Sequence, residues 1–134
     1  MSKTTESTAI RRALLIDATA SGATGFLLAA GAAQLEPVLG LPVALMRGVG
    51  IFLIPFAAFL AWLAPRALES RGLVWTIVIG NVLWVLASVM LIESGWVAPT
   101  TLGTTFVAAQ AVAVAVFAYL EYRVVARTRA SAVA

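Results

Sequence analysis

Four long stretches without any charged residue dominate this chain. Positions 18–35, 48–65, 72–92 and 94–120 contain no Asp, Glu, Lys or Arg. A helix rises about 1.5 Å per residue, so about 20 apolar residues cross the roughly 30 Å hydrocarbon core of a bilayer. Each stretch is close to that length or longer. The sequence therefore predicts an all-α membrane protein with four transmembrane helices.

The overall composition leads to the same prediction. Of the 134 residues, 62% are hydrophobic and 11% are charged, and the mean hydropathy is +1.01. Soluble domains are about 45–50% apolar and about 25% charged. A small soluble domain still exposes a large share of its surface, so it has no room to bury this much apolar area. The composition is therefore typical of a protein whose solvent is the bilayer.

The predicted spans leave only short connections. With one charged residue allowed near an end, the spans are about 13–34, 42–64, 72–92 and 97–120, and residues 1–134 form a single transmembrane domain. The connections 35–41, 65–71 and 93–96 are short, and Pro and Gly mark two of them as turns. Short connections make consecutive helices antiparallel neighbours, which predicts an up-down-up-down bundle.

The basic residues predict the orientation. Eight of the nine Lys and Arg residues lie before the first span, between the second and third spans, or after the fourth: Lys3, Arg11, Arg12, Arg66, Arg71, Arg123, Arg127 and Arg129. The positive-inside rule then places both termini, with their short basic tails, in the cytoplasm. The preference for Ala, Val, Gly and Arg is typical of a GC-rich bacterial gene. We expect a multi-pass protein of the bacterial cytoplasmic (inner) membrane.

One alternative concerns the first span. Residues 1–32 combine basic residues, an apolar run and an Ala30-Gly31-Ala32 end, which together resemble a cleaved secretory signal. Against this alternative, Asp17, Ser21 and Thr24 interrupt the apolar run. We therefore expect the first helix to remain part of the bundle.

The residue types that are missing limit the chemistry. The chain has no Cys and no His, so disulfides, the usual zinc and haem ligands and histidine proton relays are excluded. We expect no catalytic residue, no metal and no cofactor. The pI of about 10.2 suggests nucleic acid, but the basic residues follow the membrane topology instead of forming one stripe. Nucleic acid is therefore not an expected partner.

Polar residues near the middle of the spans are candidate ligand-binding residues. Thr24, Asn81 and Gln110 fall near the midpoints of their spans, and Pro55 leaves one backbone carbonyl free there. Trp84 lies on the same helical face as Asn81 and is a candidate for lining a pocket. The alternative is that the polar side chains hydrogen-bond to one another across the bundle, as is common in membrane proteins.

Charged residues within or beside the spans carry two further hypotheses. Asp17 continues into a polar stripe with Ser21 and Thr24 that must face protein. It is a candidate ligand or proton carrier, or else the partner of an arginine (Arg12, Arg71 or Arg123). On the outer side, Arg47 is a candidate anion ligand, or else it forms an ion pair with Glu36 and Glu93.

Small residues recur on the first two helices. Gly25 and Ala29 lie four residues apart on the first, and Gly50 and Ala57 lie on the second. Such residues let helix backbones approach closely. The first helix is therefore expected to be central in the bundle or to form a dimer seam.

These features predict a small non-enzymatic integral membrane protein. It is expected to bind a lipid-like or apolar ligand, or to act as an accessory subunit of a membrane complex. The candidate ligand-binding residues are Asp17, Thr24, Arg47, Asn81, Trp84 and Gln110. The alternative function is a small homo-oligomeric transporter with a midplane polar site, with proton coupling through Asp17 as an option. The expected partners are membrane lipid and either a second copy or another subunit.

Overall fold

Over the residues it describes, the structure consists of four long α-helices and one short 3-10 helix. This computed structural model describes residues 2–133, without the side chains of Lys3 and of residues 128–133. The elements are α1 (Lys3–Leu39), α2 (Val43–Leu63), the 3-10 helix η1 (Ala64–Arg66), α3 (Arg71–Glu93) and α4 (Thr101–Val133). All four α-helices are long and apolar enough to span a membrane. The prediction of four such helices is confirmed, and the described residues contain no strand.

Two helices extend well beyond their predicted spans. α2 and α3 match 42–64 and 72–92 to within one residue at each end, and α1 extends past 13–34 at both ends. α4 begins at Thr101, so the predicted start at 97 is four residues too early, and it continues past 120 to Val133. Hydropathy marks the hydrocarbon boundary, and a helix continues past that boundary as long as its backbone hydrogen bonds are made. Two of the predicted cytoplasmic basic residues, Lys3 and Arg129, have side chains outside the description.

The first predicted connection, 35–41, is wrong for most of its length. α1 runs through Pro37 to Leu39 and ends at Gly40, whose φ of 65° is left-handed and whose N–H donates to the Glu36 carbonyl. A left-handed glycine is a common helix terminator because it has no Cβ to clash with the carbonyl. Pro37 lies in the last turn and cannot donate to the Ala33 carbonyl, so α1 lacks one hydrogen bond just before it ends.

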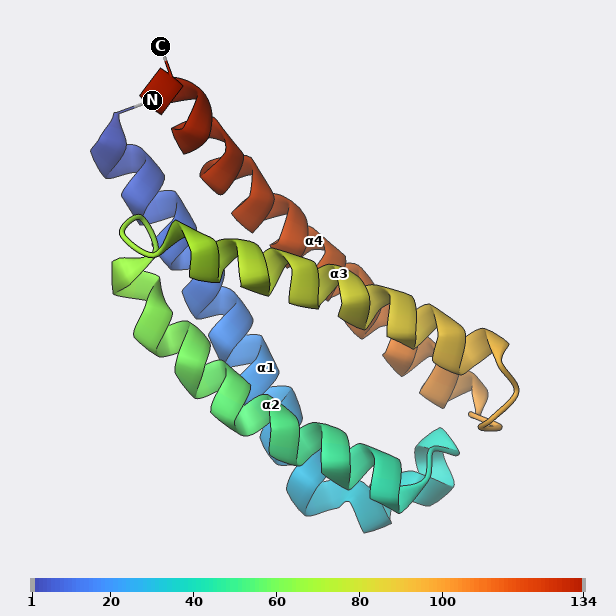
Figure 1. Cartoon of the computed structure of the whole chain (residues 1–134). Coiled ribbons are helices and arrows are strands. Elements are labelled where there is room, and N and C mark those ends of the chain that lie inside the picture. Colours follow the sequence, from blue (N-terminus) through green and yellow to red (C-terminus); the bar gives the residue numbers. More distant parts are fainter. Residues whose placement is uncertain (1, 134) are drawn as a thin grey trace.

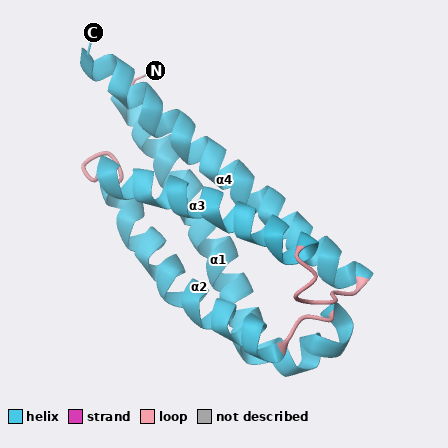
Figure 2. Ribbon diagram, turned by 45° about the vertical axis from the view of Figure 1, so that its right-hand side comes forward, coloured by secondary structure: helices cyan, strands magenta, loops and turns pink. Residues whose placement is uncertain are grey.

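The four helices form two hairpins that meet along α1 and α4. α1 packs against α2 and against α4, and α3 packs against α4. α2 and α3, although consecutive, are not a packed pair, and Figures 1 and 2 show them diverging from the short connection that joins them. The two chain ends lie close together (Figure 1). The expected side-by-side packing of consecutive helices therefore holds for each hairpin but not between α2 and α3.

Close backbone contact joins α1 to α2. A Cβ built on Gly50 meets the backbone of Ala29 and of Gly25, and a Cβ on Gly25 comes within 2.8 Å of Leu53 Cβ. Nearby, Gly22 faces Ala57 at an ordinary van der Waals distance of 3.4 Å. The small residues therefore serve the α1–α2 contact, with α1 in the central position between α2 and α4.

At the end of the bundle where α1 ends and α4 begins, α1 is in contact with Thr100, the residue that precedes α4. The Thr100 backbone N–H donates to the Leu39 carbonyl over 3.0 Å, and Thr100 Oγ1 donates to the Val38 carbonyl over 2.7 Å. Thr100 Oγ1 also accepts from the Gly103 N–H at 3.0 Å, in the first turn of α4. Only glycine fits at position 103, because a Cβ there overlaps the Leu39 carbonyl.

Two apolar clusters fill the bundle and leave a polar layer between them. One cluster, which includes Ile10, Leu14, Leu63 and Val74, lies toward the chain ends. The other, which includes Leu28, Leu39, Met46 and Val107, lies toward the opposite end. The side chains between these clusters provide the candidate functional site.

Candidate functional site

A buried hydrogen-bonded cluster joins three helices. Asp17 on α1, Asn81 on α3 and Glu121 on α4 are 1%, 4% and 0% exposed. The Asn81 amide nitrogen donates to Asp17 Oδ2 and to Glu121 Oε2, each over 3.2 Å. Ser21 Oγ donates to Asp17 Oδ1 over 2.9 Å. One amide therefore bridges two buried carboxyl groups.

The two carboxyl groups are not equivalent. Both Asp17 oxygens accept a hydrogen bond, one from Ser21 and one from Asn81. Glu121 Oε2 accepts from Asn81, but within the described part of the chain Glu121 Oε1 is a buried oxygen with no hydrogen-bond partner. An unpartnered buried polar atom is uncommon and costs free energy, so Glu121 Oε1 needs a chemical explanation.

The predicted pairing of Asp17 with an arginine is not found. Arg71 donates instead to the Val125 carbonyl over 3.0 Å, and the Arg123 guanidinium lies 5.6 Å from the centre of the Tyr119 ring. Arg12 is exposed. Asp17 faces α3 and α4, so its partners are the polar side chains that those helices bring to the same level.

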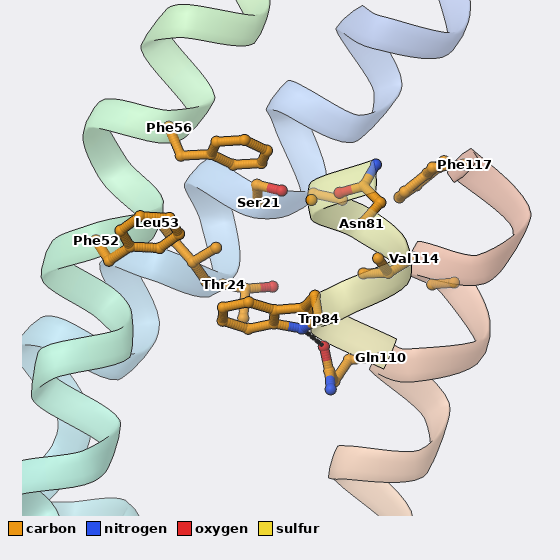
Figure 3. A pocket seen from close by; sticks show the side chains of 13 residues that line it. Ser21, Thr24, Phe52, Leu53, Phe56, Asn81, Trp84, Gln110, Val114 and Phe117 are labelled. Carbon is orange, nitrogen blue, oxygen red and sulfur yellow. Dashed lines mark hydrogen bonds between the residues drawn. The ribbon is translucent and has the colours of Figure 1, made fainter. Parts of the chain in front are cut away.

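A second polar network lies one to two turns away from the first. Trp84 Nε1 donates to Gln110 Oε1 over 2.8 Å, as the dashed line in Figure 3 marks. Gln110 Nε2 donates to Ser88 Oγ over 2.9 Å and to the Val107 carbonyl over 3.0 Å. Ser88 Oγ in turn donates to the Trp84 carbonyl over 2.8 Å. This network connects α3 to α4.

The predicted mutual pairing of Asn81, Gln110 and Thr24 is therefore wrong. The structure divides these residues between networks, with Asn81 beside Glu121 and Gln110 beside Ser88 and Trp84. The cause is the register of α3 and α4. The prediction aligned midpoints of the spans 72–92 and 97–120, whereas α4 runs from Thr101 to Val133 and is displaced along α3.

A cavity of about 160 Å³ adjoins both networks and is lined by all four helices. Its polar wall consists of Ser21, Thr24, Asn81, Trp84 and Gln110. Its aromatic wall adds Phe52, Phe56 and Phe117, and Figure 3 shows these side chains around the central space. Phe52 is 55% exposed, so the cavity is not sealed from the molecular surface. It lies where α2 and α3 are not packed against each other.

Four of the six predicted ligand-binding residues meet at this cavity. Thr24, Asn81, Trp84 and Gln110 line it, and a smaller space of about 80 Å³ shares Thr24, Trp84 and Gln110. Asp17 lies behind the wall, bonded to Ser21 and Asn81. Arg47 is exposed and is not among the lining residues.

The predicted outer ion pair is also not formed. Glu36, Arg47 and Glu93 are all exposed, and the structure, over the residues it describes, has no ion pair that joins them. Glu36 on α1 and Arg47 on α2 belong to one hairpin, and Glu93 ends α3 on the other. The divergence of α2 from α3 accounts for the distance between Arg47 and Glu93.

Sequence reasoning missed the aromatic wall. Phe52 and Phe56 lie one turn apart on α2, with ring centres 5.9 Å apart and planes 14° apart. Phe52 also stacks across the gap on Trp84, at 6.3 Å and 12°. The spacing of four residues between Phe52 and Phe56 is visible in the sequence. Their orientation toward Trp84 is not visible there, because it depends on how α2 is rotated.

The described residues contain no group of three or more His, Cys, Asp or Glu side chains arranged to hold a metal ion. Comparisons with protein-family models, with curated proteins and with solved structures found no match to this chain.

Proposed function

We propose that this protein binds a lipid-like ligand in the cavity between its two hairpins, and that its role is binding rather than catalysis. The observation that carries the proposal is a cavity with aromatic and polar walls at the place where α2 and α3 are not packed. In a bilayer, a gap between two spanning helices faces lipid. A ligand dissolved in the membrane then reaches the cavity without crossing water.

The dimensions favour a ligand with a compact head and an apolar remainder. A cavity of about 150 Å³ is known to hold one benzene ring, and the cavity here is about 160 Å³. Ligand sites combine mainly apolar walls with a few polar groups that orient the ligand. We propose that a ring-sized polar head occupies the cavity while the apolar part lies between α2 and α3.

The topology that accompanies this function is an up-down-up-down bundle with both termini cytoplasmic, in the bacterial cytoplasmic membrane. Its support is the distribution of eight of nine basic residues toward one end. Single cysteines placed near residue 2 and in the 94–100 connection are expected to react with a membrane-impermeant thiol reagent only from the inside and only from the outside, respectively. Labelling of both from one side contradicts the topology.

Gly80 offers a direct test of the ligand site. Gly80 lines the cavity, and a Cβ built on it meets nothing within 4 Å. Gly80→Leu therefore adds a side chain at the cavity wall, and its Cβ meets no neighbouring atom. Gly48→Leu is the matched control, because Gly48 also has open space around its Cβ and lines none of the three described cavities.

The measurement is native mass spectrometry of protein purified gently from its own membrane. We expect a stoichiometric small-molecule adduct on the wild type and on Gly48→Leu, and its loss from Gly80→Leu. Absence of an adduct from the wild type, or equal occupancy in both variants, contradicts the proposal. A second protein bound at fixed stoichiometry supports instead the role of an accessory subunit.

A transporter is the second candidate, and the buried carboxyl cluster beside the cavity is the observation that favours it. Ionisable groups inside the membrane are characteristic of substrate and proton pathways. Flux in proteoliposomes of the compound identified as the adduct, abolished by Gly80→Leu, supports transport. Binding without flux favours a purely binding role.

A further inference from the structure

Most hydrogen-bond donors of the cavity wall are already used within the protein. Asn81 directs its amide N–H groups to Asp17 and Glu121. Ser21 donates its hydroxyl proton to Asp17. An amide has two N–H donors and one carbonyl oxygen, and a hydroxyl has one donor and two lone pairs. Asn81 Oδ1 and the lone pairs of Ser21 Oγ are therefore left as acceptors at the cavity wall.

Trp84 and Gln110, on the same wall, have the same property. The Trp84 indole has a single N–H donor, which donates to Gln110 Oε1. The Gln110 amide nitrogen donates to Ser88 Oγ and to the Val107 carbonyl, so both of its protons are engaged. Among Ser21, Asn81, Trp84 and Gln110, every donor is engaged inside the bundle. A ligand that enters the cavity meets mainly acceptors, with the Thr24 hydroxyl as the wall group that is left able to donate. A head group that brings several donors therefore makes more hydrogen bonds than a ketone or ester head.

Two buried carboxyl groups lie behind this wall, and their hydrogen bonds differ. Both Asp17 oxygens accept hydrogen bonds, which is the arrangement that stabilises a carboxylate. Glu121 accepts on Oε2 alone and leaves Oε1 without a partner in the described part of the chain, so a proton on Oε1 would displace no hydrogen bond that Glu121 makes. Arg71 donates to the Val125 carbonyl, and no described hydrogen bond joins it to either carboxyl group.

The aromatic wall complements a cation. Phe52, Phe56, Trp84 and Phe117 line the same cavity as Ser21 and Asn81. Aromatic faces attract cations most strongly where water is excluded. Acceptor atoms, a carboxylate behind them and aromatic faces opposite them are together suited to an organic ammonium group.

We propose that the cavity binds amphiphiles with a protonated amine head group, held by Asn81 Oδ1 and Ser21 Oγ in front of the Asp17 carboxylate. This inference rests on the proposed ligand-binding function and specifies the chemical class of the ligand. In this proposal Glu121 is protonated and neutral. Asp17 and Glu121 can then both accept from the Asn81 amide without repulsion between two carboxylates.

A matched series of ring-sized probes tests the head group. 1-Phenylethylamine is a protonated amine near neutral pH, 1-phenylethanol is a neutral donor, and acetophenone has the same skeleton with an acceptor alone. Each is titrated against the protein in nanodiscs of zwitterionic lipid, and the rise in melting temperature reports binding to the folded state. We expect the amine to bind about tenfold or more tightly than the ketone, because charge-assisted hydrogen bonds and cation–π contacts add to one another. The alcohol is expected to lie between them.

Variants of the two acids test the position of the charge. Glu121→Gln keeps the shape and neutrality of a protonated Glu121, so the preference for the amine is expected to persist. Asp17→Asn removes the carboxylate and is expected to abolish that preference while the alcohol still binds. If Asp17→Asn does not fold, the order of binding of the three probes to the wild type and to Glu121→Gln still tests the preference for an amine.

The outcomes separate this inference from the proposed function. Equal or tighter binding of acetophenone, blocked by Gly80→Leu, overturns the amine inference and leaves the ligand site in place. Loss of the amine preference in Glu121→Gln overturns the assignment of the charge to Asp17. Failure of all three probes to bind, or binding that Gly80→Leu does not alter, counts against the ligand site itself.

Discussion

The Asn81 amide nitrogen lies 3.2 Å from Asp17 Oδ2 and connects α3 to α1, two helices that do not pack side by side along their lengths. The same nitrogen lies 3.2 Å from Glu121 Oε2 on α4. Since α2 and α3 are not a packed pair, α3 is held by α4, by this polar bridge and by the apolar cluster that contains Val74. Asn81 therefore has both a structural role in the bundle and a place in the cavity wall.

Replacing Asn81 by Leu is expected to destabilise the protein by about 1–3 kcal/mol, because two buried carboxyl groups lose their shared donor. Unfolding in SDS-containing mixed micelles measures this free energy. Thr76→Val is the control on the same helix. Thr76 is exposed and bonds only to the Gly72 carbonyl of its own helix, so a change within about 0.5 kcal/mol is expected. An Asn81→Leu variant as stable as the wild type contradicts the bridging role.

Gly50→Ala is expected to force α1 and α2 apart. A Cβ at Gly50 would lie 2.6 Å from the Gly25 carbonyl oxygen, and a backbone atom cannot rotate away. Overpacking of this kind costs about 1–3 kcal/mol.

Gly48→Ala is the matched control two residues away. Its Cβ meets nothing within 4 Å, so the variant is expected to gain stability by up to about 1 kcal/mol from helix propensity alone. Melting temperatures of the two variants in the same detergent provide the comparison. Equal melting temperatures would show that the α1–α2 contact is looser than the structure indicates.

Thr100 links the ends of α1 and α4. Thr100→Ala removes the bond to the Val38 carbonyl and the acceptor for the Gly103 N–H, and a loss of about 0.5–2 kcal/mol is expected from the missing helix cap. Hydrogen exchange is expected to speed up in residues 100–104 and at the end of α1. Thr100→Ser keeps the hydroxyl and should behave like the wild type. Unchanged exchange in Thr100→Ala is the contrary result.

A double-mutant cycle measures the Trp84–Gln110 hydrogen bond, which is 2.8 Å long. Trp84→Phe, Gln110→Leu and the double variant are compared by their free energies of unfolding. The coupling energy is expected to be about 0.6 kcal/mol, with about 1.7 kcal/mol as the upper range for such bonds in membrane proteins. Strict additivity of the two changes argues against the bond.

Much of the helical architecture follows from local sequence. The charge-free stretches identified four apolar helices, and Thr24, Asn81, Trp84 and Gln110 were singled out as polar or amphipathic residues in an apolar span. The stripe of Asp17, Ser21 and Thr24 faces protein as its spacing predicted, with Asp17 1% exposed. These inferences need only the hydropathy of each residue and the period of one helix.

The pairing of side chains between helices did not follow from the sequence. Asp17 was expected beside an arginine, Gln110 beside Asn81 and Arg47 beside two glutamates, and none of these pairs is present among the described residues. Each depends on the register and rotation of helices far apart in the chain. A displacement of α4 by one or two turns is enough to exchange the partners.

The sequence by itself therefore determined that the chain is built of four apolar helices and which side chains are polar within them, because burial in a bilayer is decided residue by residue over a fixed thickness. Only the tertiary structure decided that α2 and α3 diverge, that Asn81 bridges Asp17 and Glu121, and that aromatic side chains face these groups across a cavity. Those features arise from close packing at Gly25 and Gly50 and from the offset of α4 along α3. Both are set by contacts between helices and not by the preferences of any one segment.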